Sequence, residues 1–451
     1  MNLSHNPIVE LTDFLRFPSI STQPEYAPDL IACAEWLVER LNRAGLSAKL
    51  YPTAGHPIVL AQTEHDPEKR TVLIYGHYDV QPVDPLNQWT TPPFEPRIDE
   101  SEGKIYARGS ADNKGQILPH ILGVAETLEK KGALPVNVIF LIEGEEEIGS
   151  PHLENFLKEH REELNCDVIV ISDTGMAPGN LPAMTYGLRG LAAMELIVRG
   201  PARDLHSGLF GGAVANPLIA AAKLIASLHD EKGHILIPHF YDDVESMQPW
   251  EKEASLAFEK VSGGDTLVKE LAGVRELFGE IGFSTQERLG ARPAVDINGF
   301  GGGYQGEGTK TVLPKEAFIK LTFRLVPNQN PEAILDHAAA HFQKHLLPGV
   351  TLEIKRGHAG EAYVSNPQSP DGKAAQAALQ QAFGATPVLL RDGASIPILT
   401  SFKKILGVDS LLLGLANPDC CIHSPNENML LKNFLKGIRL NQILLEKLAE
   451  S

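Results

Sequence analysis

Three short apolar runs constrain the fold of this chain more than any other feature of its sequence. They occupy residues 72–75, 138–142 and 168–171 and contain no charged residue. Strands that are buried on both faces carry such continuous runs, whereas half-exposed strands alternate between apolar and polar residues. Segments with the helical spacing of apolar residues, at 29–41 and 116–130, lie before and between these runs. This alternation predicts an α/β fold with a largely parallel sheet.

A change of pattern in the middle of the chain predicts a second domain. A chain of 451 residues has room for about two or three domains. We expect a discontinuous main domain at 1–187 and 365–451, with an inserted α+β domain at 188–364. The expected strands of the insertion are 191–198, 317–325 and 350–355, and its expected helices are 216–228 and 331–345.

Charge and cysteine content disfavour several classes of function. The formal net charge of −17 argues against nucleic acid or an anionic membrane as a partner. No run approaches the roughly 18 consecutive apolar residues of a membrane span, and residues 1–14 do not resemble a signal peptide. The four cysteines form no C-x-x-C pair, which disfavours a cysteine zinc site and a disulfide framework. We expect a cytoplasmic protein.

Acidic and imidazole side chains follow the apolar runs. His77 and Asp79 come shortly after the first run, beyond Gly76; a glutamate-rich segment at 143–147 follows the second run, and Asp173 follows the third. In an open parallel sheet, ligand sites lie beyond the carboxyl ends of the strands. We therefore expect these side chains to converge at one edge of the sheet.

Asp112 and His423 extend this set. Asp112 lies among small residues at 108–115, so its carboxylate can approach another group closely, and His423 follows an apolar run at 411–415. The alternative for Asp112 and Asp173 is a helix-capping role, and the alternative for the glutamates is a solvated face. Each residue alone fits that alternative, whereas the whole set at strand ends favours a shared site.

Several carboxylates in one crevice require positive charge, because they repel one another and raise each other's pKa. Two Zn²⁺ ions would balance three ligating carboxylates and a bridging hydroxide, with two neutral imidazoles completing the coordination. Two metals about 3.5–4 Å apart polarise a carbonyl and generate the hydroxide that attacks it. A nearby glutamate that binds no metal then serves as general base. The residues alone do not choose among Glu143, Glu145, Glu146 and Glu147.

The chain resembles the co-catalytic zinc metallopeptidase family that includes aminoacylases, glutamate carboxypeptidase, succinyl-diaminopimelate desuccinylase and carnosine-type dipeptidases. The resemblance covers essentially the whole chain. It implies a mostly parallel-sheet α/β catalytic domain of the phosphorylase/hydrolase-like class, with the insertion as an α+β lid or dimerisation domain. The segments that carry it are 76–80 (Gly-His-Tyr-Asp-Val), 108–115 (Arg-Gly-Ser-Ala-Asp-Asn-Lys-Gly), 143–150 (Glu-Gly-Glu-Glu-Glu-Ile-Gly-Ser), 172–173 (Ser-Asp) and the late His423.

The resemblance implies a role for each candidate in the main domain. Two divalent ions are implied, with Zn²⁺ the first candidate and Mn²⁺ the second. Asp79 would orient the first histidine, and Glu146 would be the general base. His77 and Asp173 would hold one metal ion, Glu147 and His423 would hold the other, and Asp112 would bridge both.

Segments at 204–208, 310–314, 323–329 and 391–397 resemble the carnosine-dipeptidase branch, the cytosolic non-specific dipeptidases. The resemblance implies a homodimer in which His206 reaches the active site of the other subunit and stabilises the oxyanion. Arg324 would clamp the substrate carboxylate, and Thr311 and Ser395 would add hydrogen bonds. Without the resemblance, His206 fits an ordinary loop residue and Arg324 fits an ion pair on a strand face.

The leading hypothesis is a dipeptidase that cleaves short peptides with a free C-terminal carboxylate. The first alternative is a deacylase of N-acyl or N-succinyl amino acids on the same scaffold. The second is a non-catalytic metal-binding or dimeric interaction protein, against which the intact Glu146 argues.

One motif points elsewhere but lacks its context. Residues 301–306 match G-x-G-x-x-G, which binds dinucleotides only between a strand and a helix. Residues 309–313 fit a strand, so we interpret the motif as a flexible loop near the substrate.

Overall fold

The computed structural model describes residues 6–393, 396 and 398–451. The chain divides into two compact units. Unit 1 comprises residues 1–186, 365–390 and 401–451, and unit 2 comprises residues 187–364 and 391–400. Unit 2 therefore includes a segment after the insertion that the sequence alone gave to the main domain. One contact behind this is the ion pair from Arg391 to Glu251.

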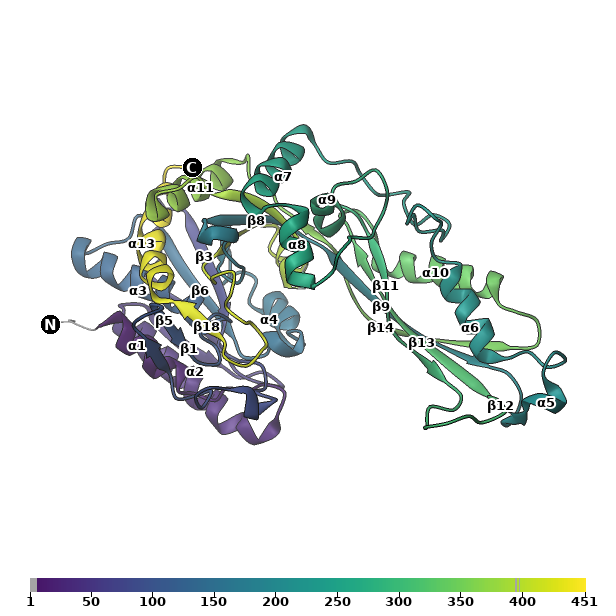
Figure 1. The fold of residues 1–451 in the computed structure, drawn as a ribbon. Coiled ribbons are helices and arrows are strands. Elements are labelled where there is room, and N and C mark those ends of the chain that lie inside the picture. Colours follow the sequence, from purple (N-terminus) through teal and green to yellow (C-terminus); the bar gives the residue numbers. More distant parts are fainter. Residues whose placement is uncertain (1–5, 394–395, 397) are drawn as a thin grey trace. The chain divides into compact units, whose positions relative to one another are not determined.

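A mixed sheet forms the centre of unit 1 (Figure 1). Its strands follow the order β1-β2-β6-β3-β7-β17-β8. The four strands from β6 to β17 are parallel, whereas β1, β2 and β8 pair antiparallel with their neighbours. The α/β class is confirmed, but the sheet is mixed rather than mostly parallel. The strands are β1 (Ser47–Tyr51), β2 (Ile58–Gln62), β3 (Thr71–His77), β6 (Asn137–Glu143), β7 (Val168–Ile171), β8 (Ala183–Leu188) and β17 (Ser410–Gly414).

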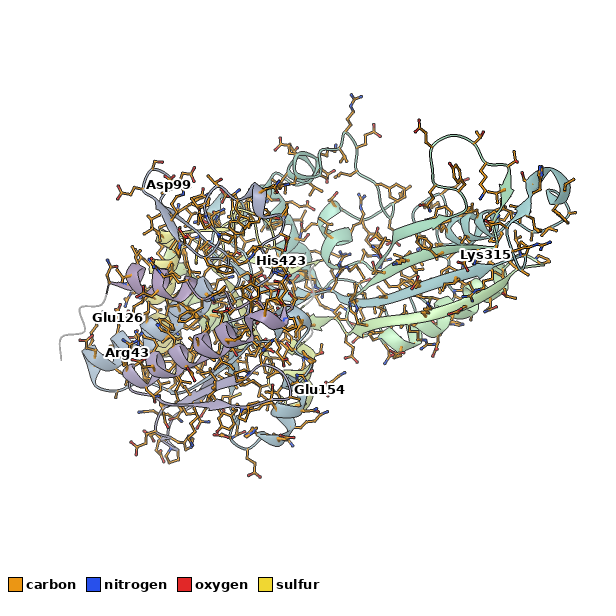
Figure 2. All side chains as sticks on the ribbon, turned by 90° about the horizontal axis from the view of Figure 1, so that it is seen from below. Arg43, Asp99, Glu126, Glu154, Lys315 and His423 are labelled. Atoms are coloured by element: carbon orange, nitrogen blue, oxygen red, sulfur yellow. The ribbon has the colours of Figure 1, made fainter. Side chains whose placement is uncertain are left out.

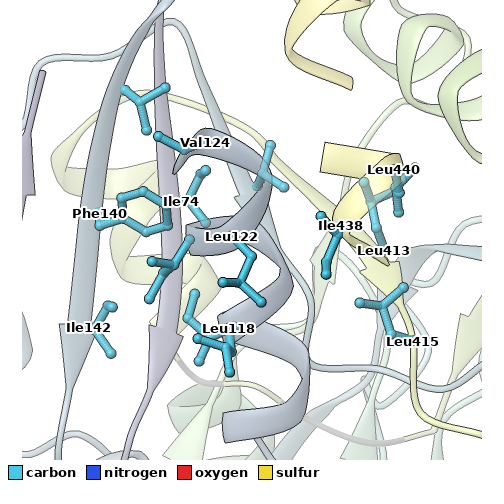
Figure 3. Close-up of a cluster of buried hydrophobic side chains, with 14 of the residues drawn as sticks. Ile74, Leu118, Leu122, Val124, Phe140, Ile142, Leu413, Leu415, Ile438 and Leu440 are labelled. Carbon is cyan, nitrogen blue, oxygen red and sulfur yellow. The ribbon is translucent and has the colours of Figure 1, made fainter. Parts of the chain in front are cut away.

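Helices bury the sheet of unit 1. The helix α3 packs against β3, and α13 packs against both α3 and α11. Figure 3 shows the resulting core, where Ile74 and Phe140 of the sheet meet Leu118 and Leu122 of α3. Every residue of β3 and β6 is buried, as their continuous apolar runs predict. The helices are α1 (Pro7–Leu15), α2 (Ala27–Arg43), α3 (Lys114–Lys131), α4 (Leu153–Glu159), α11 (Pro370–Phe383), α12 (Ile398–Ile405) and α13 (Leu431–Leu448).

A small antiparallel sheet lies beside this core in the order β18-β5-β4. Its strands are β4 (Arg97–Asp99), β5 (Lys104–Tyr106) and β18 (Asn428–Leu430). The pairing of β5 with β18 brings Ile105 beside Met429, although the two residues are far apart in the sequence. Figure 2 shows charged side chains such as Arg43, Glu126 and Glu154 at the surface of unit 1.

Unit 2 is an antiparallel sheet in the order β11-β13-β9-β14, covered by α6 and α10. Burial alternates along β9 and β13, so one face of each strand packs beneath these helices. The elements are β9 (Gly190–Arg199), β10 (Leu205–His206), α5 (Ser207–Phe210), α6 (Pro217–Ala226), α7 (Pro249–Ser262), α8 (Asp265–Ala272), α9 (Thr285–Gly290), β11 (Ala294–Gly302), β12 (Val312–Leu313), β13 (Glu316–Leu325), α10 (Pro331–His345) and β14 (Thr351–Gly360). The short strands β15 (Tyr363–Val364) and β16 (Val388–Asp392) both pair with β8.

The glycine-rich segment is not wholly a loop. Gly301 and Gly302 belong to β11 and pair with Phe318 and Ala317 of β13. A Cβ atom on Gly302 would lie 2.8 Å from the carbonyl oxygen of Glu316, so glycine permits this close pairing. The loop interpretation was therefore wrong for these two residues.

None of the helices within the described residues combines the length and the apolar character needed to cross a membrane.

Candidate metal centre

The parallel strands of unit 1 deliver the candidate residues to one edge of the sheet. His77 is the last residue of β3 and stands in register with Glu143, the last residue of β6. The strand β7 ends at Ile171, two residues before Asp173. Because these strands are parallel, their carboxyl ends meet at the same edge. The helix α3 begins at Lys114, which follows Asp112 and Asn113 directly.

Two carboxylates gather around His77. Its Nε2 lies 3.1 Å from Oδ1 of Asp112 and 3.7 Å from Oδ1 of Asp173. The imidazole is fully buried, and both carboxylates are nearly so. Among the described residues these three form a group whose ligand atoms lie within 4.8 Å of one another, close enough to hold a metal ion.

A second group shares Asp112. Nε2 of His423 lies 3.0 Å from Oδ2 of Asp112 and 3.2 Å from Oε2 of Glu147. The ligand atoms of these three residues also lie within 4.8 Å of one another, close enough to hold a metal ion. Each oxygen of Asp112 therefore faces a different histidine, and one carboxylate belongs to both groups.

The charges of this centre fit divalent cations. Burial raises the pKa of Glu147, because its ionised form loses hydration. Burial also acts on Asp112, but hydrogen bonds from His423 and His77 outweigh it and lower the pKa of that carboxyl. Hydrogen bonds that its imidazole donates to Asp112 and Glu147 raise the pKa of His423 to about 10. The carboxylates thus draw positive charge to this position, and imidazole nitrogens with carboxylate oxygens are a ligand set that suits Zn²⁺.

Asp79 organises both halves of the centre. Its carbonyl oxygen accepts a hydrogen bond from Nδ1 of His77 at 3.1 Å, which leaves Nε2 of the imidazole as the ligand atom. Its carboxylate accepts from the backbone N–H groups of Glu146 at 3.2 Å and Glu147 at 3.1 Å. One buried residue therefore positions His77 through its backbone carbonyl and the short 3-10 helix Glu146–Ile148 through its carboxylate.

The four glutamates that the sequence left open differ in their surroundings. Oε1 of Glu143 accepts hydrogen bonds from Tyr75 at 2.6 Å and Ser150 at 2.7 Å, and Glu145 pairs with His152. Glu147 belongs to the second group of ligands. Burial raises the pKa of Glu146 well above its ordinary value, and the charges of Asp173, Asp112 and Glu147 add to this effect. Glu146 therefore lies beside the ligands without belonging to either group.

Sequence reasoning missed two side chains that touch the ligands. Nδ2 of Asn113 donates to Oδ1 of Asp173 and to the carbonyl oxygen of Ser172, both at 2.7 Å. Nε2 of Gln81 donates to Oε2 of Glu147 at 2.7 Å. Asn113 follows Asp112 directly, which is a signal that could have pointed to it, whereas nothing in the sequence distinguishes Gln81.

The remaining candidates belong to unit 2, except that Ser395 lies outside the described residues. His206 in β10 pairs with Val312 in β12, and the N–H of Ser207 donates to the carbonyl oxygen of Thr311. His206 and Thr311 are therefore neighbours at the end of the sheet where Figure 1 shows β12 and α5.

Arg324 lies near the opposite end of the same sheet. It is eight residues beyond Glu316, where β13 begins, and a strand rises about 3.4 Å per residue. About 27 Å therefore separates Arg324 from the end of β13 next to β12. Burial lowers the pKa of Arg189 to about 10, with a further contribution from the charge of Arg324, so two guanidinium groups lie near each other.

Comparison with known proteins gives consistent matches. The model of Peptidase family M20/M25/M40 matches residues 73–447. The Cys-Gly metallodipeptidase dug1 of Schizosaccharomyces pombe is 32% identical over 96% of this chain and 93% of its own length. The Beta-Ala-His dipeptidase of Homo sapiens is 33% identical over 85% of this chain and 76% of its own length. The crystal structure of the M20 family metallo-carboxypeptidase Sso-CP2 from Sulfolobus solfataricus superposes with a TM-score of 0.86 at 33% identity, covering 99% of this chain and 100% of that one.

Proposed function

Because this chain belongs to Peptidase family M20/M25/M40, and is thus a hydrolase, we propose that it is a metal-dependent dipeptidase. Its substrates would be dipeptides or short peptides with a free C-terminal carboxylate. The family resemblance found in the sequence is confirmed, and the relatives agree with the carnosine-dipeptidase branch. The observation that carries the proposal is Asp112, whose two oxygens each face a different histidine.

The residues of both groups would hold two metal ions. His77 and Asp173 would bind one, His423 and Glu147 the other, and Asp112 both. Two such ions, Zn²⁺ or Mn²⁺, supply Lewis acidity at the substrate carbonyl and lower the pKa of water. Gln81, Asn113 and Asp79 would fix the orientation of the ligands, because each donates to or accepts from a ligand residue.

Glu146 would move the proton. Its carboxylate accepts a proton from the water whose oxygen attacks the carbonyl carbon, and the C–N bond then breaks as Glu146 returns that proton to the leaving amine nitrogen. The raised pKa of Glu146 suits this second role, because a weaker acid holds the proton until the amine takes it. Asp79 supports Glu146 by accepting a hydrogen bond from its backbone N–H.

Unit 2 would bind the substrate and form a dimer, with unit 1 as the catalytic domain. Arg324 would pair with the terminal carboxylate, and Thr311 and Ser395 would add hydrogen bonds. His206 would stabilise the oxyanion in the partner's site. The distance of about 27 Å along β13 supports this arrangement, since one copy of unit 2 does not present His206 and Arg324 to the same small dipeptide.

A substrate panel tests the proposal. Dipeptides, their N-acylated counterparts and their C-terminal amides would be incubated with the protein before and after chelation, and after Zn²⁺ or Mn²⁺ is restored. We expect hydrolysis of the unmodified dipeptides, loss of activity on chelation and recovery with metal. Activity that survives complete metal removal would contradict the proposal, and a preference for N-acylated substrates would identify a deacylase instead.

A further inference from the structure

Glu427 is a buried charge that the proposed mechanism does not use. It lies four residues after His423 and just before β18, and its side chain has no exposed surface. Most buried carboxylates require several partners, because ionised groups lose their hydration. The hydrogen-bond donors to the carboxylate of Glu427 all come from one distant segment, residues 108–112.

Each carboxylate oxygen of Glu427 accepts two hydrogen bonds. Oε2 accepts from Nη1 of Arg108 at 2.8 Å and from the backbone N–H of Gly109 at 3.0 Å. Oε1 accepts from the backbone N–H groups of Ala111 at 2.7 Å and Asp112 at 3.0 Å. The backbone of the residue shared by both ligand groups is thus tied directly to Glu427.

Strand pairing brings these segments together. Asn428 of β18 pairs with Tyr106 of β5, and the N–H of Ala107 donates to the carbonyl oxygen of Glu427. Arg108 is also held in place, because its Nη2 donates to the carbonyl oxygen of Pro82 at 2.9 Å. The carboxylate of Glu427 therefore enters the turn that ends at Asp112 from a fixed direction.

The segment that carries His423 has an unfavourable backbone conformation. Cys421, His423 and Asn426 all have a positive φ, at 56°, 58° and 62°, which non-glycine residues seldom adopt. Such a backbone persists only where its surroundings hold it. Glu427 follows this segment directly, and its carboxylate binds it to residues 108–112 through four hydrogen bonds.

We propose that Glu427 is a positioning residue that fixes Asp112 relative to His423, so that both metal ions bind tightly. The inference rests on the proposed two-metal site. A positioning role differs from a role in stability alone. Loss of Glu427 should weaken metal binding more than does a substitution elsewhere in unit 1 that lowers folding stability by the same amount.

Glu427→Gln tests this role with almost no change in shape. The amide replaces one oxygen, so in either orientation its NH₂ group faces two N–H donors that had an acceptor. We expect metal retention to fall about 10–100-fold, as found for groups that orient metal ligands. The assay loads the full-length protein with Zn²⁺, dialyses it against a series of chelator concentrations, and measures metal per chain.

Asp371→Asn is the matched control. Asp371 receives a forked ion pair from Arg70 in unit 1, at 2.7 and 3.1 Å, and neither residue belongs to the metal centre. We expect this variant to lower the thermal midpoint while metal retention stays within about twofold of the wild type. Suppose that the two variants lower the thermal midpoint by the same amount. If Asp371→Asn and Glu427→Gln then lost the same amount of metal, the role of Glu427 would be structural and the inference would be overturned.

Two further outcomes separate this inference from the proposed function. A wild-type chain that retains no metal would overturn the proposed function and the inference with it. Wild-type retention that equals that of Glu427→Gln would overturn the inference alone. If Glu427→Gln does not fold, Arg108→Lys takes its place, because it keeps the charge but not both hydrogen bonds of the guanidinium. It should weaken metal retention in the same direction, and unchanged retention would contradict the inference.

Discussion

Replacement of Glu146 by glutamine separates proton transfer from metal binding. The two side chains have nearly the same shape, and Glu146 belongs to neither group of ligands. The variant therefore loses the carboxylate that would accept and return the proton, while every proposed metal ligand remains. General acid–base catalysis contributes about 10²–10⁴-fold, which corresponds to about 3–5 kcal/mol of the activation free energy.

Glu143→Gln is a suitable control for this experiment. Both hydrogen bonds to Glu143 reach Oε1, from Tyr75 and Ser150, so a glutamine carbonyl can accept both. Burial raises the pKa of Glu143 to about 7, so near neutral pH the neutral amide removes less than a full negative charge. We expect the control to keep turnover within about tenfold of the wild type, since the hydrogen bonds to the Glu143 carboxylate come from Tyr75 and Ser150 and not from a proposed ligand.

The assay measures kcat for dipeptide hydrolysis and metal per chain for both variants and the wild type. We expect Glu146→Gln to lose at least a hundredfold in kcat with unchanged metal content. Turnover that survives in Glu146→Gln but collapses in Glu143→Gln would refute the assignment of the base. Loss of metal from Glu146→Gln would show that this residue is a ligand.

Two further predictions concern the dimer and the response to acid. If His206 acts in the partner's site, His206→Ala and Glu146→Gln are each inactive alone, but their hybrid dimer holds one complete site. Mixing equal amounts with subunit exchange should then restore about a quarter of wild-type activity, and no recovery in verified hybrids would place His206 in its own subunit's site. His120 is buried beside Ser172 and Asn441, and burial lowers its pKa from 6.5 to about 4. Below pH 6.5 the imidazole therefore takes up a proton in the unfolded chain, whereas in the folded chain it stays neutral down to about pH 4, so the free energy of unfolding decreases as the pH falls through this window. His120→Gln should abolish about 2 kcal/mol of the decrease between pH 7 and pH 5, as measured by urea unfolding. An unchanged pH dependence of the free energy of unfolding would contradict this prediction.

Local patterns in the sequence were sufficient to predict many of the elements. The continuous apolar runs at 72–75, 138–142 and 168–171 lie within the buried strands β3, β6 and β7, and the helical spacing at 331–345 matches α10. Period and burial are encoded residue by residue, so such elements are visible without the fold. Strand ends follow from the same runs, which is why His77 and Asp173 stood out as neighbours.

The direction of the outer strands was not visible in the sequence. An apolar strand such as β2 has the same pattern whether it pairs parallel or antiparallel, and the wrong expectation of a mostly parallel sheet follows from this. The helices α7 to α9 and the strand pairing of Gly301 and Gly302 also escaped sequence reasoning. Their positions depend on packing within unit 2 rather than on a regular local pattern.

The chain's own residues thus determined the strands, their ends and the acidic and imidazole groups that follow them. The family resemblance implied which of these groups share Asp112, whereas only the tertiary structure decided which polar side chains hold them. The physical reason is that a hydrogen bond requires two groups within about 3 Å, and only the packing of strands and helices in the folded chain creates that proximity between distant segments. Glu427 and Ala111 are 316 residues apart in the sequence and 2.7 Å apart in the fold.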